Sequence, residues 1–247
     1  MKINKFKKLS KGKYKLFFDN TELILHEDII LKYDLLIKND IDIDLLDKII
    51  EDNKYYECYN QALDYIEIKM RNKKEIIKYL EKKEYTEKYI DFTIEKLEQL
   101  NILNDNRYIE AYINDKIHLS NDGPNKIKKD LMSFGFNEQN INDYLYKIND
   151  ETWKEKVNKI INKKKSIMKS KSYYMFIQKL KNDLYNMGYT EDLIEDNLRN
   201  IEYNSNAITK DFEKLNKKYK SDKTKIINSM LRKGYNYEEI KQLFDNE

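Results

Sequence analysis

The sequence contains few of the residues that end or bend regular structure, with one proline and five glycines among 247 residues. Because tight turns draw on these two residues, their scarcity favours a mainly helical chain. The single cysteine, Cys58, excludes an intrachain disulfide framework and fits a reducing compartment. The two histidines, His26 and His118, are far apart and leave no zinc-ligand spacing. We therefore expect neither a metal nor a cofactor.

Long hydrophobic runs and catalytic motifs are also lacking. No stretch approaches the roughly 20 apolar residues of a membrane-spanning helix, and the first residues do not resemble a signal peptide. We therefore expect a cytoplasmic protein without a membrane partner. The sequence has no glycine-rich phosphate loop, Walker pattern or nucleophile elbow, so an enzyme is not expected. A metal-dependent nuclease is the most distant alternative.

An internal repeat organises most of the chain. Each copy has two apolar residues four positions apart, then a glycine, and an aromatic residue directly after the glycine. The first copy has Glu84 in place of the glycine. The aromatic residues of the four copies, at spacings of 51, 53 and 46 residues, are Tyr85, Phe136, Tyr189 and Tyr235. Repetition at such a period is typical of a helical-repeat protein.

The repeat predicts two helices joined by a tight turn. Apolar residues four positions apart lie on one helix face, and glycine readily adopts the left-handed conformation that ends a helix. Glu84 must therefore adopt that strained conformation or end its helix in another way. The aromatic residues are expected to pack on the turn rather than to stack on bases. Polar residues then cap the second helices, and these are Thr86, Asn137, Thr190 and Asn236.

The remaining segments predict the fold. Residues 13–18 and 22–25 read as short strands, with a third at 2–6, and a third helix for each repeat comes from the sequence between copies. We predict a mainly α fold, an elongated array of three-helix repeats with a small N-terminal β-hairpin/β-α extension. The softest joint is expected at residues 202–207. The predicted parts are the extension at 1–54, three-helix repeats at 55–120, 121–166 and 167–218, and a partial repeat (a helix pair) at 219–247.

Positive charge is concentrated in one segment. The net charge is only +3, yet residues 156–182 carry nine lysines and no acid. One interpretation is a solvated helix face. The other is a surface that contacts nucleic-acid phosphates, because lysine clusters without acids attract polyanions, with affinity but no sequence specificity. The candidate contacts in this segment are Lys156, Lys159, Lys163, Lys164, Lys165, Lys169 and Lys171.

Several segments resemble the RecX family of bacterial RecA regulators. Residues 103–112 are similar to its Leu-Asp-Asp-x-Arg-Phe-Ala-x-x-Tyr signature, and residues 123–131 to its Gly-Pro-x-x-Ile-x-x-Glu-Leu segment. Residues 62–66 and 71–76 resemble the segments that open its first repeat. The resemblance covers nearly the whole chain. The chain departs from the family pattern at Asn104, Tyr108, Ile109 and Asp130.

The resemblance implies a role in binding rather than catalysis. It implies that the protein lies along the groove of the RecA–single-stranded DNA filament, contacts more than one protomer, and restrains RecA's ATPase, strand exchange and coprotease activities. The expected partners are therefore the RecA filament and the single-stranded DNA within it. The lack of a coiled-coil seam favours a monomer. Basic residues in the segments that resemble the family are further candidates for contact with the DNA or the filament. They are Arg71, Arg107, Lys126, Lys128 and Lys129.

Two further functions stay open on the sequence. In the first, a helical-repeat protein binds DNA through the lysine-rich segment without RecA. In the second, the chain is a protein–protein scaffold whose lysines are merely solvated.

Overall fold

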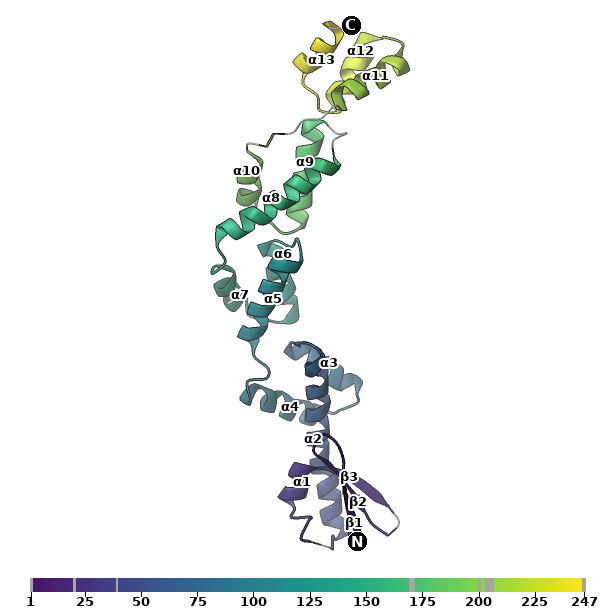
Figure 1. Cartoon of the computed structure of the whole chain (residues 1–247), viewed down its shortest axis with the longest axis vertical. Helices are drawn as coiled ribbons and strands as arrows, with labels where there is room; N and C mark the ends of the chain where they lie inside the picture. The colour runs from purple at the N-terminus through teal and green to yellow at the C-terminus, as the bar shows by residue number, and fades with distance from the viewer. Residues whose placement is uncertain are drawn as a thin grey trace. The chain divides into compact units, whose positions relative to one another are not determined.

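The structure, a computed structural model, describes residues 2–19, 21–38, 40–168, 172–199, 201–202 and 207–245. Within these residues the chain is mainly helical with a small N-terminal sheet (Figure 1), which confirms the predicted fold class. The chain divides into two compact units, Met1–Tyr108 and Ile109–Glu247. Most of the joint expected at 202–207 lies outside the described residues. Among the helices described, none combines the length and apolarity needed to span a bilayer.

The first unit begins with a three-stranded antiparallel sheet. Its strands, in the spatial order β1-β2-β3, are β1 (Lys5–Lys8), β2 (Lys13–Phe17) and β3 (Glu22–His26). Leu16 and Leu25 are buried and share a core with Ile29 and Ile49 of the following helices. The two predicted strands are confirmed. The third begins at Lys5 rather than Lys2, because Lys2 forms only an isolated bridge.

The first three-helix group completes this unit. After the short α1 (Glu27–Lys32) come α2 (Ile43–Ile68), α3 (Lys73–Lys82) and α4 (Glu87–Gln99). These last three helices share a core that includes Cys58, Ile76, Leu80 and Ile94. A capping box between Asn72 and Glu75 starts α3. The helix α2 passes without a break through the predicted boundary at residue 54.

Three more helix groups follow. They are α5 (Asp105–Leu119), α6 (Pro124–Phe134) and α7 (Glu138–Leu145); α8 (Asp150–Ile167), α9 (Tyr173–Asn186) and α10 (Glu191–Leu198); and α11 (Ala207–Tyr219), α12 (Lys223–Arg232) and α13 (Tyr237–Asp245). The helix α5 crosses the division between the units. Figure 1 shows α11, α12 and α13 as one group, and these three helices share a core around Phe212 and Met230.

Each hairpin packs with the helix before it, whereas the predicted repeats at 121–166 and 167–218 place it with the helix after it. Tyr112 of α5 donates a 2.9 Å hydrogen bond to Asp130 of α6, and its ring lies edge-on to Phe134 at 5.5 Å. Hydrophobic periodicity locates a helix but does not say which neighbour covers its apolar face. The predicted domain boundaries stay predictions.

The turns of the repeats have the predicted conformation. The three glycines are left-handed, with φ of 97° at Gly135, 86° at Gly188 and 80° at Gly234, and Glu84 adopts the same strained region with φ of 66°. The aromatic residues after the turns are buried in three copies. Tyr85 is half-buried, and burial raises its pKa to about 12. Packing of these rings within the fold is therefore confirmed for the described structure.

The predicted helix caps are only partly present. Asn137 accepts hydrogen bonds from the backbone N–H groups of Gln139 and Asn140, as expected of a cap. Thr86 and Thr190 do occupy the N-cap positions, but their side chains make no capping hydrogen bond in the described structure. These helix N-termini are instead stabilised by carboxylates in the first turn, such as that of Glu87, whose negative charge interacts favourably with the helix dipole.

Neighbouring groups of the second unit meet at the glycine turns. The N–H of Gly123 donates to the carbonyl of Met187 at 2.6 Å, and the N–H of Asn125 donates to that of Gly188 at 3.0 Å. A Cβ on Gly188 would lie 2.4 Å from the backbone N of Lys126. The start of α6 therefore docks directly on the backbone of the next turn.

The same junction recurs one repeat later. The hydroxyl of Ser172, the N-cap of α9, donates to the carbonyl of Lys233. A Cβ on Gly234 would lie 2.6 Å from the ring of Tyr174. The repeat glycines of these two turns are thus needed for close packing as well as for their backbone conformation.

We expect Glu84→Gly to stabilise the protein by about 1 kcal/mol, because a residue with a Cβ is strained in the left-handed region and glycine is not. Thermal unfolding followed by circular dichroism should show a melting temperature raised by a few degrees. The matched control is Glu81→Gly in the last turn of α3, which should lower stability because glycine disfavours a helix. A fall in melting temperature for Glu84→Gly would contradict this assignment of strain.

We expect Gly188→Ala to destabilise the protein by about 2 kcal/mol or more, because the new methyl adds a backbone clash to left-handed strain. Urea denaturation provides the measurement. Gly12→Ala is the control, since Gly12 has φ of 65° but its nearest neighbour is the flexible Glu27 side chain. Equal losses in the two variants would show that the backbone contact contributes nothing.

Candidate nucleic-acid interface

The lysine-rich segment begins on α8, where burial separates two faces. Trp153, Val157 and Ile160 are buried on one face. Lys159 and Lys163 are exposed, and at a spacing of four residues they are neighbours on the opposite face. The periodicity that builds the core therefore also directs these two ammonium groups to solvent.

Lys156 has an intramolecular role. Its ammonium donates to the backbone carbonyls of Lys116 at 3.0 Å, Ile117 at 2.7 Å and Ser120 at 2.9 Å. These carbonyls lie at the C-terminal end of α5, where a cation is favourable. Burial lowers the pKa of Lys156. This side chain closes the end of one helix and is poorly placed for a phosphate.

Lys164 is also engaged within the fold. It pairs with Asp183 of α9 at 2.6 Å, with both side chains partly buried, and Lys179 approaches the same carboxylate at 3.7 Å. Lys165 on the same helix is half-exposed and has no ion pair among the described residues. Within one run of three lysines, the structure thus distinguishes an internally paired side chain from one that faces solvent.

The three candidate lysines of α6 differ in the same way. Lys126 pairs with Asp122 and Lys128 with Glu138, each at 2.6 Å. Lys129 is exposed and makes no ion pair within the described part of the chain. Its charge is therefore the one on this helix that is open to a ligand.

The two candidate arginines have opposite environments. The guanidinium of Arg71 lies 3.9 Å from the ring centroid of Tyr65 and pairs with Glu75 at 3.5 Å, and its side chain is only 13% exposed. Arg107, in the first turn of α5, is exposed, and over the described ranges its side chain has no hydrogen bond or ion pair. Arg71 holds the fold together, and Arg107 can face a partner.

The candidate contacts therefore fall into three sets, and their role in binding stays a prediction. Lys169 and Lys171 lie outside the described residues. Those held by intramolecular partners are Lys156, Lys164, Lys126, Lys128 and Arg71. Those that are unpaired within the described ranges are Lys159, Lys163, Lys129 and Arg107, which are exposed, and Lys165, which is partly buried.

A charged network around Asp122 was not predicted. Its buried carboxylate accepts from Lys116 and Lys126, both at 2.6 Å. Although burial acts to raise it, these two pairs hold the pKa of Asp122 below its usual value. Burial and the hydrogen bond to Asp130 raise the pKa of Tyr112 to about 12. The spacing of Asp122 and Lys126, four residues apart across Gly123-Pro124, was the available signal.

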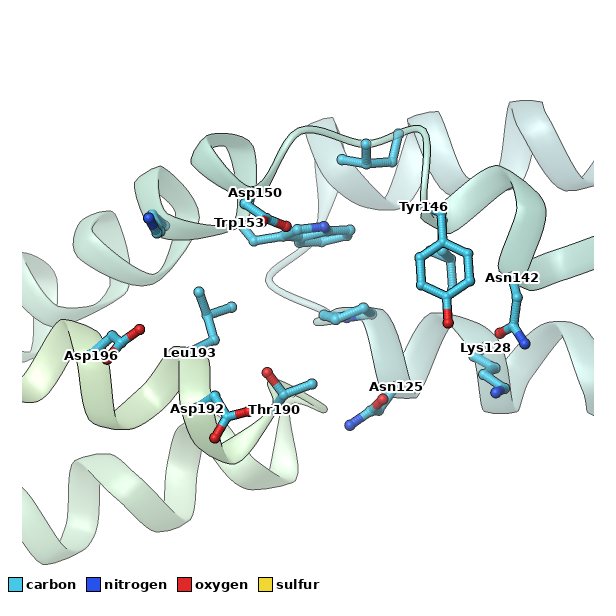
Figure 2. Close-up of a pocket in the computed structure, with 14 residues that line it drawn as sticks. Asn125, Lys128, Asn142, Tyr146, Asp150, Trp153, Thr190, Asp192, Leu193 and Asp196 are labelled. Atoms are coloured by element: carbon cyan, nitrogen blue, oxygen red, sulfur yellow. The ribbon is translucent and has the colours of Figure 1, made fainter.

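A cleft between the second and third helix groups was also not predicted. It has a volume of about 520 Å³ and is lined by residues of α6, α7, α8 and α10 and of the segments beside them. Figure 2 shows Trp153 and Leu193 between Tyr146 on one side and Asp196 on the other, with Asp192 beside Thr190 below Leu193. No sequence motif marks the cleft, because its residues come from four helices and meet only when two repeats stack.

The residues considered for metal or nucleophilic chemistry have other positions. His26 caps α1 by accepting from the N–H of Asp28, and its ring stacks on Tyr56 at 5.4 Å. Cys58 is buried, and burial raises the pKa of its thiol, which suits packing rather than nucleophilic attack. Among the described residues, no three His, Cys, Asp or Glu side chains are grouped to hold a metal.

Comparison with known proteins gives consistent similarities. The family described as "RecX, first three-helix domain" matches residues 58–97, which span most of the first helix group. The regulatory protein RecX of Streptococcus agalactiae serotype III (strain NEM316) is 31% identical over 254 residues, which cover 98% of this chain and 97% of the relative. That of Clostridium perfringens (strain 13 / Type A) is 32% identical over 179 residues, covering 72% and 84%.

Solved structures show the same likeness. The one described as "Crystal structure of regulatory protein RecX" has a TM-score of 0.68 and 22% identity, and it covers 81% of this chain and 100% of that chain. RecX from Lactobacillus salivarius has a TM-score of 0.56 and 29% identity, and it covers 59% and 95%. At 22% identity the first of these supports the fold alone.

We expect Lys156→Met to lower the free energy of unfolding by about 1–2 kcal/mol, because three carbonyls at the end of α5 lose a charged donor. Urea denaturation followed by the emission of Trp153, the only tryptophan, provides the measurement. The exposed Lys159→Met is the matched control and should stay within about 0.5 kcal/mol of the wild type. Equal stability of the two variants would refute a structural role for Lys156.

Proposed function

Because the chain belongs to the RecX family, we propose that it binds the RecA–single-stranded DNA filament and restrains RecA's ATPase, strand exchange and coprotease activities. The observation that carries this proposal is the similarity to regulatory RecX proteins along nearly the whole chain. Repeated helix groups suit this role, because each group that binds raises the effective concentration of the next.

The DNA of the filament is proposed to meet the exposed basic side chains. On α8 these are the exposed Lys159 and Lys163 and the partly buried Lys165, which have no acidic partner among the described residues. Free ammonium groups displace condensed counterions from phosphates, whereas paired ones must first give up their carboxylate. Lys129 and Arg107 are proposed as additional contacts. Lys156 and Arg71 are proposed to act through the fold instead.

The mode of action is proposed to be binding rather than catalysis, by a monomer in the cytoplasm. RecA partnership is favoured over binding of DNA without RecA because the similarity to RecX regulators extends through all four helix groups. The exposed lysines alone suit either function, so the two must be separated by experiment.

The test is a titration of the protein into the single-stranded-DNA-dependent ATPase of the cognate RecA. We expect inhibition at well below one copy per RecA protomer, because one regulator contacts several protomers. No effect at saturating protein, together with tight binding to bare single-stranded DNA, would instead establish a RecA-independent DNA-binding protein. No effect and no DNA binding would favour a scaffold.

We expect the triple variant Lys159→Glu, Lys163→Glu and Lys165→Glu to inhibit this ATPase at least tenfold less potently, because three phosphate attractions become repulsions. Lys164 is left unchanged since its pair with Asp183 belongs to the fold.

The control for this variant is Lys210→Glu, Lys214→Glu and Lys217→Glu, which changes three exposed lysines of α11 by the same total charge. It should retain more of the inhibition. Equal potency of the α8 variant and the wild type across moderate salt would overturn the DNA-facing role of α8.

A further inference from the structure

The cleft between the second and third helix groups has a charge opposite to that of the lysine-rich segment. Asp150, Asp192 and Asp196 stand at its rim, against the ammonium groups of Lys128 and Lys154. Glu138 already neutralises Lys128 at 2.6 Å. The balance at this rim is therefore negative, in a chain whose net charge is positive.

The floor of the cleft is apolar. Trp153 is only 6% exposed, so its indole forms a rigid base, and Leu145, Ile148 and Leu193 are half-buried beside it. Figure 2 shows the ring of Tyr146 standing at the side of the cleft away from Asp192 and Asp196. Tyr146 is 83% exposed, which is unusual for a large aromatic side chain. An exposed aromatic ring beside an apolar floor is typical of the centre of a protein interface.

We propose that this cleft is the docking site for a basic segment of a RecA protomer, with an apolar side chain seated over Trp153 and a neighbouring Lys or Arg paired with Asp192 and Asp196. The proposal rests on the proposed function, which supplies RecA as the partner. A volume of about 520 Å³ admits a few side chains, within the range of ligand pockets.

The sign of the charge selects a protein over a nucleic acid as the occupant. The excess of carboxylates over ammonium groups at the rim disfavours phosphates and favours ammonium and guanidinium groups. Asp192 and Asp196 are both exposed and one helical turn apart on α10, so one basic side chain can reach both. The 3.4 Å pair of Asp196 with Arg199 is solvent-exposed and gives way at little cost. The exposed lysines would then bind the DNA of the filament, and this acidic cleft would bind its RecA protein.

The experiment measures the affinity of the immobilised full-length protein for the preassembled cognate RecA–single-stranded DNA filament. The test variant is Asp192→Asn with Asp196→Asn, which removes two charges and keeps the shape of both side chains. Its matched control is Asp143→Asn with Glu155→Gln, two exposed acids of α7 and α8 that do not line the cleft. We expect the test variant to bind the filament about fivefold to tenfold more weakly at low salt, and the control to bind like the wild type. The difference should shrink as salt screens the pairs.

A second pair of variants probes the apolar contact. Tyr146→Ala removes the exposed ring at the cleft, and Tyr237→Ala removes an exposed ring of α13 as the control. We expect at least fivefold weaker filament binding for Tyr146→Ala alone. Emission of Trp153 and thermal melts verify that each variant is folded.

The outcomes separate this proposal from the proposed function. If the wild type binds the filament and the cleft variants bind equally well, the docking site is overturned and the regulatory function stands. If the wild type does not bind the filament at all, the proposed function falls and the docking site with it. A labelled oligo-dT strand completes the test. Loss of its affinity in the Asp192→Asn, Asp196→Asn variant would make nucleic acid the occupant and overturn the proposal, whereas unchanged or tighter binding supports it.

Discussion

The close backbone contact at Gly188 determines how the second and third helix groups stack, and the surfaces of this region depend on it. The start of α6 reaches the next turn through two backbone hydrogen bonds, with no room for a Cβ on Gly188. Clefts lie beside this junction, and Asn125 lines two of them. The acidic cleft exists because backbone hydrogen bonds fix the spacing of the two groups while their side chains leave space between them.

Much of the fold could be predicted because the repeat combines two strong local signals. Apolar residues four positions apart indicated the helices. The glycines indicated the turns, where Gly135, Gly188 and Gly234 have the left-handed conformation. The grouping of helices could not be predicted, since α5 has an apolar face but no local mark of its partner. The role of glycine in close packing could not be predicted either, because the contact between Gly188 and Lys126 joins residues 62 positions apart.

The candidate interface was predicted at the level of a segment and not of single side chains. A run without acids looked uniformly free, yet Lys164 finds Asp183 and Lys156 finds carbonyls of α5. Asp183 directly follows the acid-free run, and backbone carbonyls do not enter a charge count, so only the tertiary structure shows which lysines these groups hold. Lys159 and Lys163 could be assigned to the solvent face in advance, because the helical period that buries Val157 and Ile160 also fixes their direction.

The junction at the glycine turns also gives the second unit a direction. At both junctions described above, the N-terminus of the second helix in one group docks on the turn of the following group, as Gly123 does on the turn at Gly188 and Ser172 on the turn at Gly234. A head-to-tail contact of this kind has no two-fold symmetry. The surface formed by successive groups therefore differs between the N-terminal to C-terminal direction and the reverse. A DNA strand, with its 5′ and 3′ ends, is likewise directional. A row of helix groups that binds along a DNA strand would therefore favour one orientation relative to the 5′ and 3′ ends over the opposite one.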